Sequence, residues 1–231
     1  MSHYTVAVFH RKDQDIDELL APFSEELKVE PYIVYTKQEA IAKARERYEA
    51  CKDKTDEECY QFMADGYQTD DEENLLSTYN PDSKWDWYQE GGRWSGMLRR
   101  KSDGAEVDEG RVGDLEFGLD EEEYKDALRF WDIVVDHKPH KPDEEYHTIY
   151  KEEYYKEYYG DRDTYARHCA QFSTFAVITP DGVWHEKGEM GWFGCSSETP
   201  EEAKDWEEHY KERFLDTADP DWILTIVDCH I

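Results

Sequence analysis

The two ends of the chain constrain its fold more than any other feature. Residues 4–10 (YTVAVFH) and 222–231 (WILTIVDCHI) are rich in apolar and β-branched side chains, a pattern typical of buried strands. Chain ends fray unless other parts of the protein hold them in place. We therefore predict that the first and last strands lie side by side in one mixed or antiparallel sheet.

The segments between these ends predict helices and short strands that pack against the sheet. Thr36, Thr55 and Thr199 each occupy a position typical of a helix N-cap, and Thr36 is followed three residues later by Glu39. A hairpin is predicted where two apolar runs flank the Pro-Asp-Gly of residues 180–182. These patterns indicate the α+β class, with helices mainly on one face of the sheet.

Residues 102–171 hold a large share of the acidic side chains. Their apolar spacing predicts one helix over about 121–137 and a second over about 146–171, with a break near Gly160. No repeat or low-complexity linker marks a domain boundary anywhere in the chain. We therefore predict a single α+β domain over residues 1–231, with an acidic helical insertion at about 102–171.

The net charge limits the partners that the chain can have. There are 57 Asp and Glu residues against 27 Lys and Arg, which gives a formal charge of -30. A surface this negative repels nucleic acid and anionic membranes, so we expect neither to be a direct partner. A basic protein, including one that itself binds DNA, remains compatible with this charge.

Several motifs of well-known chemistry are absent from the sequence. It has no P-loop, no G-x-S-x-G, no G-x-G-x-x-G and no H-E-x-x-H, so we expect neither a cofactor nor a metal. The five cysteines are widely spaced and form no C-x-x-C pair. With no signal peptide and no long apolar run, free thiols in a reducing cytoplasm fit best.

Residues 80–96 (NPDSKWDWYQEGGRWSG) carry the most unusual composition in the chain. A guanidinium suits a carboxylate or phosphate, tryptophans can stack on a ligand, and the glycines at 91 and 92 allow a close backbone approach. The predicted ligand-binding residues are Lys84, Trp85, Asp86, Trp87, Arg93 and Trp94, together with Trp192 from the later motif GEMGWFG. The alternative is a half-buried strand in which Asp86 simply pairs with Arg93.

Three further residues are candidates for catalysis. Asp228 and His230 leave the last strand on the same face, where they could act as a base and its orienting partner, while Cys229 points the other way. Glu189 lies in the glycine-rich motif GEMGWFG (188–194), which could project its carboxylate into a cleft. The alternative for residues 228–230 is a frayed polar end.

These motifs carry a resemblance to a protein family. The opening MSHYTV, the central NPDSKWDWYQEGGRWSG, the loop GEMGWFG and the closing VDCHI resemble a family of uncharacterised proteins from bacteria and their phages. The resemblance implies no activity, because none is established for that family. It implies that the candidate residues belong to shared motifs, and it makes a phage origin plausible.

Two functions are compatible with these observations. In the first, the tryptophans, the arginine and the carboxylates line a pocket that binds a small anionic, nucleotide-like ligand and, in an enzymatic version, also processes it. In the second, the acidic chain is an inhibitor that mimics DNA and occupies a basic host protein, for example a defence nuclease. Whether the protein is an enzyme is left open by its sequence.

Overall fold

The computed structural model describes residues 2–142 and 144–231, with the exception of the side chain of Trp192. Contacts divide the chain into two compact units. Unit 1 consists of Met1–Leu20 and Trp85–Ile231, and unit 2 of Ala21–Lys84. The predicted insertion at 102–171 thus belongs to unit 1, whereas the segment that forms a unit of its own lies earlier in the chain. The single-domain organisation stays a prediction.

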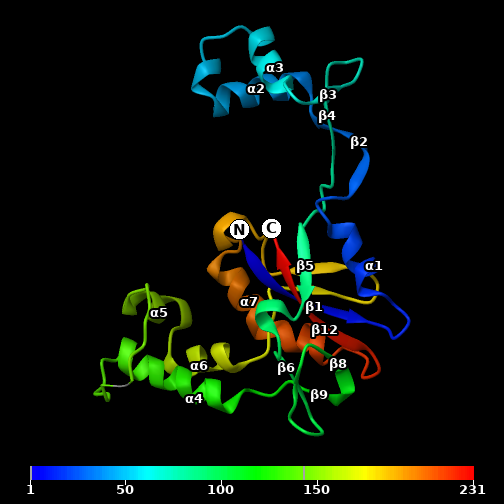
Figure 1. Cartoon of the computed structure of the whole chain (residues 1–231). Helices are drawn as coiled ribbons and strands as arrows, with labels where there is room; N and C mark the ends of the chain where they lie inside the picture. Colours follow the sequence, from blue (N-terminus) through cyan, green and yellow to red (C-terminus); the bar gives the residue numbers. More distant parts are fainter. Residues whose placement is uncertain (1, 143) are drawn as a thin grey trace. The chain divides into compact units, whose positions relative to one another are not determined.

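Unit 1 is built on a mixed sheet with the two terminal strands at its centre. The strand order is β11-β10-β1-β12-β5, and β8 also pairs with β12, next to β5 along the same edge. The strands are β1 (His3–His10), β5 (Trp87–Glu90), β8 (Glu109–Arg111), β10 (Ala176–Ile178), β11 (Trp184–Glu186) and β12 (Ile223–His230). Figure 1 shows β1 and β12 side by side, with both chain ends at the same end of the sheet.

The pairing of these strands confirms the predicted fold class. β1 and β12 are antiparallel over their whole length, from the His3–His230 pair to the His10–Ile223 pair. β1 and β10 are parallel, so the sheet is mixed. The N- and C-terminal strands are therefore neighbours, as their apolar sequences predict.

The main core lies between the sheet and the helix that precedes its last strand. Helix α7 (Pro200–Tyr210) continues into the π-helical turn η7 (Lys211–Leu215). Trp206 and Tyr210 pack against Ala7 and Phe9 of β1. Each buried aromatic side chain of this kind stabilises the fold by roughly 2–3 kcal/mol. Thr199 caps α7 with the predicted capping box.

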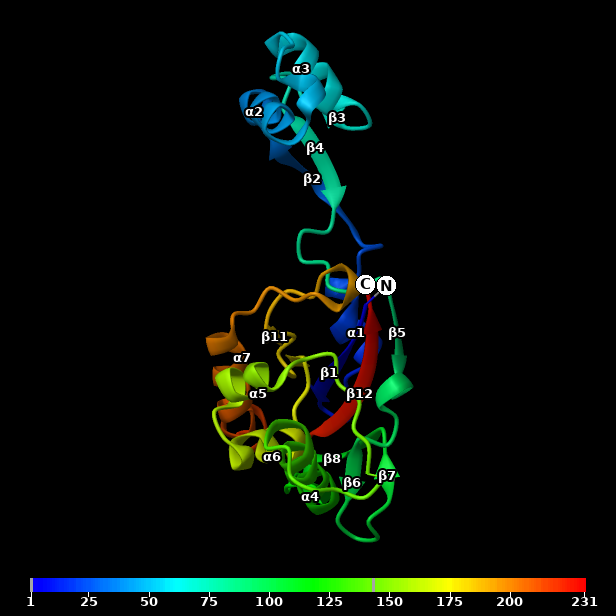
Figure 2. The ribbon, with the colours of Figure 1, turned by 90° about the vertical axis from the view of Figure 1, so that its left-hand side faces the viewer.

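Helices lie on both sides of this sheet. α4–α7 are on one side of β1 and β12 in Figure 1, and the short α1 (Ile16–Leu20) is on the other. Figure 2 shows β12 running between β1 and β5 from a second direction. Among these helices, α7 packs on the sheet, whereas η5 (Trp131–Val135), α5 and α6 pack on one another in a separate cluster.

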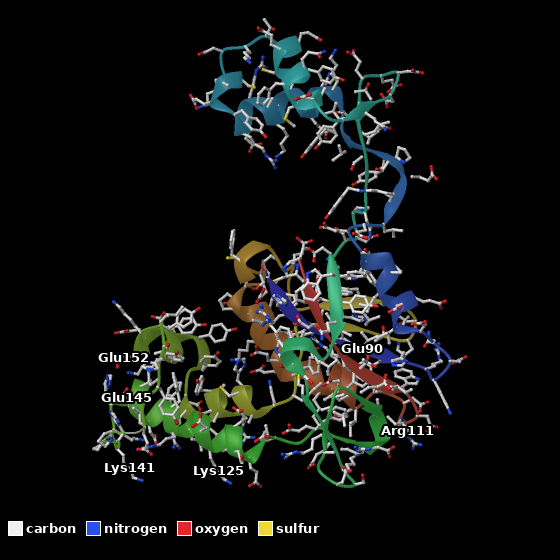
Figure 3. All side chains as sticks on the ribbon, in the orientation of Figure 1. Glu90, Arg111, Lys125, Lys141, Glu145 and Glu152 are labelled. Atoms are coloured by element: carbon white, nitrogen blue, oxygen red, sulfur yellow. The ribbon has the colours of Figure 1, made fainter. Side chains whose placement is uncertain are left out.

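The predicted acidic insertion contains strands as well as helices. β7 (Glu106–Val107) and β9 (Leu115–Glu116) pair with β6 (Leu98–Arg100), which lies just before the insertion, in a small sheet. The helices that follow are α4 (Glu121–Phe130) with the π-helical turn η5 (Trp131–Val135), α5 (Glu152–Tyr159) and α6 (Arg162–Ala170). Gly160 breaks the second predicted helix at a φ of +77°. Charged side chains such as Lys125 and Glu145 lie on the outside of this region (Figure 3).

Unit 2 has a small sheet and a helical pair of its own. Its strands β2 (Lys28–Tyr35), β4 (Leu75–Tyr79) and β3 (Gln68–Thr69) pair in that order. Helices α2 (Lys37–Arg47) and α3 (Asp56–Ala64) both begin with a capping box, at Thr36 and Thr55. The described residues contain no helix with the length and apolar character that crossing a bilayer requires.

Candidate functional site

Strand register places three residues in a row across neighbouring strands, and their rings form a cluster in which each ring contacts the other two. His3 of β1 and Trp87 of β5 both lie opposite His230 of β12, one on each side of it. The Trp87 ring stacks on His230 with 5.1 Å between centroids and an interplanar angle of 17°. The two imidazoles meet edge to face, with centroids 4.9 Å apart. The row lies on the sheet face that also carries Ala7 and Phe9, because side chains alternate along a strand.

Each histidine in this row is held by a carboxylate. Nδ1 of His3 lies 2.9 Å from Oδ1 of Asp228, and Nδ1 of His230 lies 2.6 Å from Oδ1 of Asp86. An ionised carboxylate can only accept a hydrogen bond, so each Nδ1 carries the proton and donates it. This fixes the orientation and tautomer of both rings, as an orienting carboxylate does in many enzyme sites.

The second nitrogen of each imidazole is available. Nε2 of His3 and Nε2 of His230 make no hydrogen bond with a described residue. Among the described residues, the only fully buried side-chain nitrogen or oxygen without a partner is Oε2 of Glu198, so both Nε2 atoms reach solvent. Both nitrogens therefore keep some contact with solvent at the end of the sheet where the chain termini lie, although the side chains of His3 and His230 are only 13% and 7% exposed. We call His3, Asp86, Trp87, Asp228 and His230 the histidine row.

Two consecutive glycines allow the chain after β5 to close over Asp228. Gly92 has a φ of +55°, and a Cβ at this position would lie 2.4 Å from Cβ of Asp228. The backbone N–H of Arg93 donates to Oδ2 of Asp228 at 3.1 Å. With His3 on Oδ1, both carboxylate oxygens of this buried side chain are satisfied. The Gly-Gly-Arg sequence thus holds Asp228 in place, and Asp228 in turn orients His3.

The guanidinium of Arg93 remains open to solvent. Arg93 is exposed, and its side chain forms no hydrogen bond or ion pair with any other residue that the structure describes. The predicted alternative, a pair between Asp86 and Arg93, is not formed, because Asp86 contacts His230 instead. Asp86 also accepts from the backbone N–H of Trp87 at 2.8 Å. A cationic group without a partner is therefore attached to the segment that borders the histidine row.

The opposite sheet face holds groups that are unsuited to this chemistry. Cys229 and Tyr88 lie opposite each other and point away from the row. Burial raises the pKa of the Cys229 thiol well above its usual value, and the nearby charge of Asp228 adds to this. Burial and the hydrogen bond to Asp17 raise the pKa of Tyr88. Neither group is ready to ionise, so neither is a nucleophile near neutral pH.

Two further candidates of the central motif, Trp85 and Trp94, contact other parts of unit 1. The Trp85 ring packs edge to face on Tyr88, and its Nε1 donates to the carbonyl oxygen of Leu20 at 3.2 Å. Trp94 is partly buried against the main core. Lys84 belongs to unit 2, where its backbone N–H donates to the carbonyl oxygen of Phe23. Of the predicted binding residues whose side chains are described in unit 1, Asp86 and Trp87 are the two that join the row.

The loop that carries GEMGWFG reaches the same end of the sheet through its backbone. Oγ of Ser2 donates to the carbonyl oxygen of Gly191 at 2.6 Å and accepts from the N–H of Gly194 at 2.7 Å. Glu189 is exposed, and its carboxylate contacts none of the described residues. The side chain of Trp192 lies outside the described part of the structure. The loop thus borders the strand that carries His3, while Glu189 itself points to solvent.

Sequence reasoning did not select His3. The signal was present, since the prediction that the terminal strands pair antiparallel places a residue near the start of β1 beside one near the end of β12. What the sequence could not supply was the register, which sets His3 rather than Tyr4 opposite His230.

The row is suited to proton transfer. In an imidazole whose Nδ1 is fixed by a carboxylate, Nε2 is the atom that accepts or donates a proton to a ligand. Among the described residues, no three His, Cys, Asp or Glu side chains are placed to hold a metal ion together. Comparison of the chain with models of protein families, with curated proteins and with solved structures finds no match in any of the three.

Proposed function

We propose that the histidine row binds a small anionic, nucleotide-like ligand and exchanges protons with it. The observation that carries this proposal is the pair of imidazoles, each held at Nδ1 by its own carboxylate and each with an Nε2 that has no partner among the described residues. A purely structural histidine pair would gain nothing from leaving both Nε2 atoms without partners.

Binding of an anion is supported by the groups around the pair. Trp87 is 43% exposed, which leaves ring surface for a base to stack on. Arg93 has an unpaired guanidinium on the segment next to Asp228, and a guanidinium binds phosphate with two parallel hydrogen bonds. A protonated imidazole adds a second positive charge. In a chain with a formal charge of -30, these positive charges are what would attract an anionic ligand.

A reaction that uses both histidines is cleavage of a phosphate ester. A neutral Nε2 takes the proton from the attacking hydroxyl or water as the new P–O bond forms. A protonated Nε2 on the other ring donates its proton to the leaving oxygen as the old P–O bond breaks. Acid–base groups of this kind each contribute about 10²–10⁴-fold to a rate. The 4.9 Å between ring centroids allows one substrate to contact both rings.

Binding is tested by titrating the protein with 5′-AMP in a calorimeter. Arg93→Ala should abolish binding and leave the melting temperature nearly unchanged, since this side chain has no partner to lose. The matched control is Arg100→Ala, which removes the same charge from an exposed arginine paired with Asp103. Equal effects of the two variants on binding, or a large loss of stability in Arg93→Ala, would contradict the proposal.

Processing is tested with bis(p-nitrophenyl) phosphate. His3→Gln and His230→Gln should each lower the hydrolysis rate at least about 10²-fold, because each removes one proton-transfer group. Hydrolysis by the wild type that survives in both variants would place the chemistry elsewhere.

A cytoplasmic location and a phage origin are part of the same proposal. All five cysteines are unpaired, which fits a reducing compartment. The second function, a DNA mimic that occupies a basic host protein, rests on net charge, and no contact between described residues adds to it. Its test is the salt dependence of binding to such a protein, where an affinity that stays flat from low to high salt would exclude it.

A further inference from the structure

A cavity lies at the opposite end of the central strand β1 from the histidine row. It has a volume of 450 Å³, within the range of small-molecule sites. Phe9, near the end of β1, is one of its walls, roughly 20 Å along the strand from His3. The other walls come from the β10–β11 turn, from η7 and from the segment before β12. They include Thr179, Asp181, His185, Phe214 and Trp222.

The lining combines aromatic rings with positive charge. Phe9, Phe214 and Trp222 supply the rings, and Arg11 and Arg213 supply the charge. By contrast, a cavity of 620 Å³ beside α4 is lined by four acidic and two basic residues. In a chain with twice as many acids as bases, a cavity with two arginines and one acid differs clearly from the average surface.

The polar groups of this cavity differ in how far they are already satisfied. The guanidinium of Arg11 donates to the carbonyl oxygen of Pro180, at 3.4 Å, and pairs with no carboxylate among the described residues. Arg213 donates to Asp205 at 2.7 Å. The one acid in the lining, Asp181, accepts a hydrogen bond from Thr179 at 2.6 Å. Arg11 is therefore the cation left to bind an anion there.

We propose that this cavity binds a small aromatic anion, a planar ring that carries one carboxylate or phosphate. The ring lies among Phe9, Phe214 and Trp222, where it loses contact with water, and its charged group pairs with Arg11. His185, whose ring packs on Phe214 at 5.4 Å, faces the same space and offers a further hydrogen bond. This site shares no residue with the histidine row, so it stands or falls independently of the function proposed above.

Three probes in calorimetric titrations separate the parts of this proposal. Indole-3-acetate carries a carboxylate, phenyl phosphate carries a phosphate, and indole-3-acetamide has the ring without the charge. A ligand of this size should bind with a Kd on the order of 1 mM or tighter. At least one of the two anions should saturate the site and bind about tenfold or more tightly than the amide, because the charged hydrogen bond to Arg11 is missing in the amide. Whichever anion binds more tightly identifies the charged group.

Matched variants locate the binding. Arg11→Gln should weaken the tighter anion about tenfold or more. Lys12→Gln makes the same change of net charge in the same turn, outside the cavity lining, and should leave binding within about twofold, since exposed charges are screened. Arg93→Ala, in the histidine row, should also leave it unchanged. Thr217→Trp places a large ring at the cavity edge and should abolish binding of all three probes.

The results that would overturn the proposal are equally specific. For the wild type, these results are the absence of saturable binding by both anions at concentrations 10-fold above the expected Kd, or equal affinity for the amide and the anions. For the variants, they are equal effects of Arg11→Gln and Lys12→Gln on anion binding, or unchanged binding in Thr217→Trp. Nuclear magnetic resonance shifts of the Trp222 indole N–H on titration provide a check that does not depend on how the variants fold.

Discussion

Gly92→Ala is the sharpest test of how the histidine row is held together. The residue has a φ of +55°, a region that costs an L-amino acid about 1–2 kcal/mol. The added methyl would also lie 2.4 Å from Cβ and 2.6 Å from Oδ2 of Asp228, well inside ordinary van der Waals contact. Forcing extra volume into a packed site costs about 1–3 kcal/mol. We expect a total loss of about 2–5 kcal/mol in the free energy of unfolding.

Gly104→Ala is the matched control. This glycine has a similar φ of +69°, but a Cβ there would meet no atom within 4 Å. It therefore reports the backbone cost alone, about 1–2 kcal/mol. The difference between the two variants, about 1–3 kcal/mol, isolates the overlap with Asp228. It corresponds to roughly 2–4 °C in melting temperature for each kcal/mol in a chain of this size.

Tryptophan fluorescence during urea unfolding is the suitable assay. All eight tryptophans lie between residues 85 and 222, so the signal reports unit 1 without interference from unit 2. Because Asp228 must move in Gly92→Ala, the imidazole resonances of His3 should also shift, and they should not shift in Gly104→Ala. Equal destabilisation by the two substitutions, with His3 unmoved, would refute the close packing of Gly92 on Asp228.

Three further outcomes are expected. Hydrogen bonding to Arg129 lowers the pKa of Glu144 to about 2, so this group stabilises the fold above its unfolded pKa of about 4.5. The loss of unfolding free energy in Arg129→Gln, measured by urea unfolding, should therefore be full at pH 7 and should fade as the pH falls toward 2. Thr199→Ala removes the cap of α7 and should cost about 1 kcal/mol, whereas Thr199→Ser should cost less, both by urea unfolding. Tyr210→Phe removes one of the two hydrogen bonds of the buried Thr174 hydroxyl, which keeps only its bond to the carbonyl oxygen of Ala176, and should also cost about 1 kcal/mol, seen as a lower urea midpoint.

Much of the fold could be predicted because local patterns and the fold agree. The apolar end segments form β1 and β12, and the threonine caps begin α2, α3 and α7. The break at Gly160 follows from its positive φ, which ends α5. Each of these features depends on residues that are close in sequence, and such short-range signals are readable without coordinates.

The candidate site could be predicted only in part, because it depends on register. Asp228 and His230 share a face through strand alternation, which the sequence shows. Their partners Asp86 and His3 come from other strands, and no short-range pattern fixes which residues face each other across a ladder. The same limit applies to β8, whose residues 109–111 have no strand-like sequence and form a strand only because β12 offers an unpaired edge.

The distance along the chain between β1 and β12 also determines when the histidine row can exist. His3 and Asp228 are 225 positions apart, yet their hydrogen bond joins neighbouring strands at the centre of the sheet. During synthesis β1 cannot pair with β12 until nearly all of the following chain has been made. The strand pairs of unit 2, by contrast, join residues that are closer in sequence. Pairings between segments as distant as β1 and β12 form slowly. A ribosome-bound chain that lacks its last strand would therefore lack the histidine row, because two of its five residues, Asp228 and His230, belong to that strand.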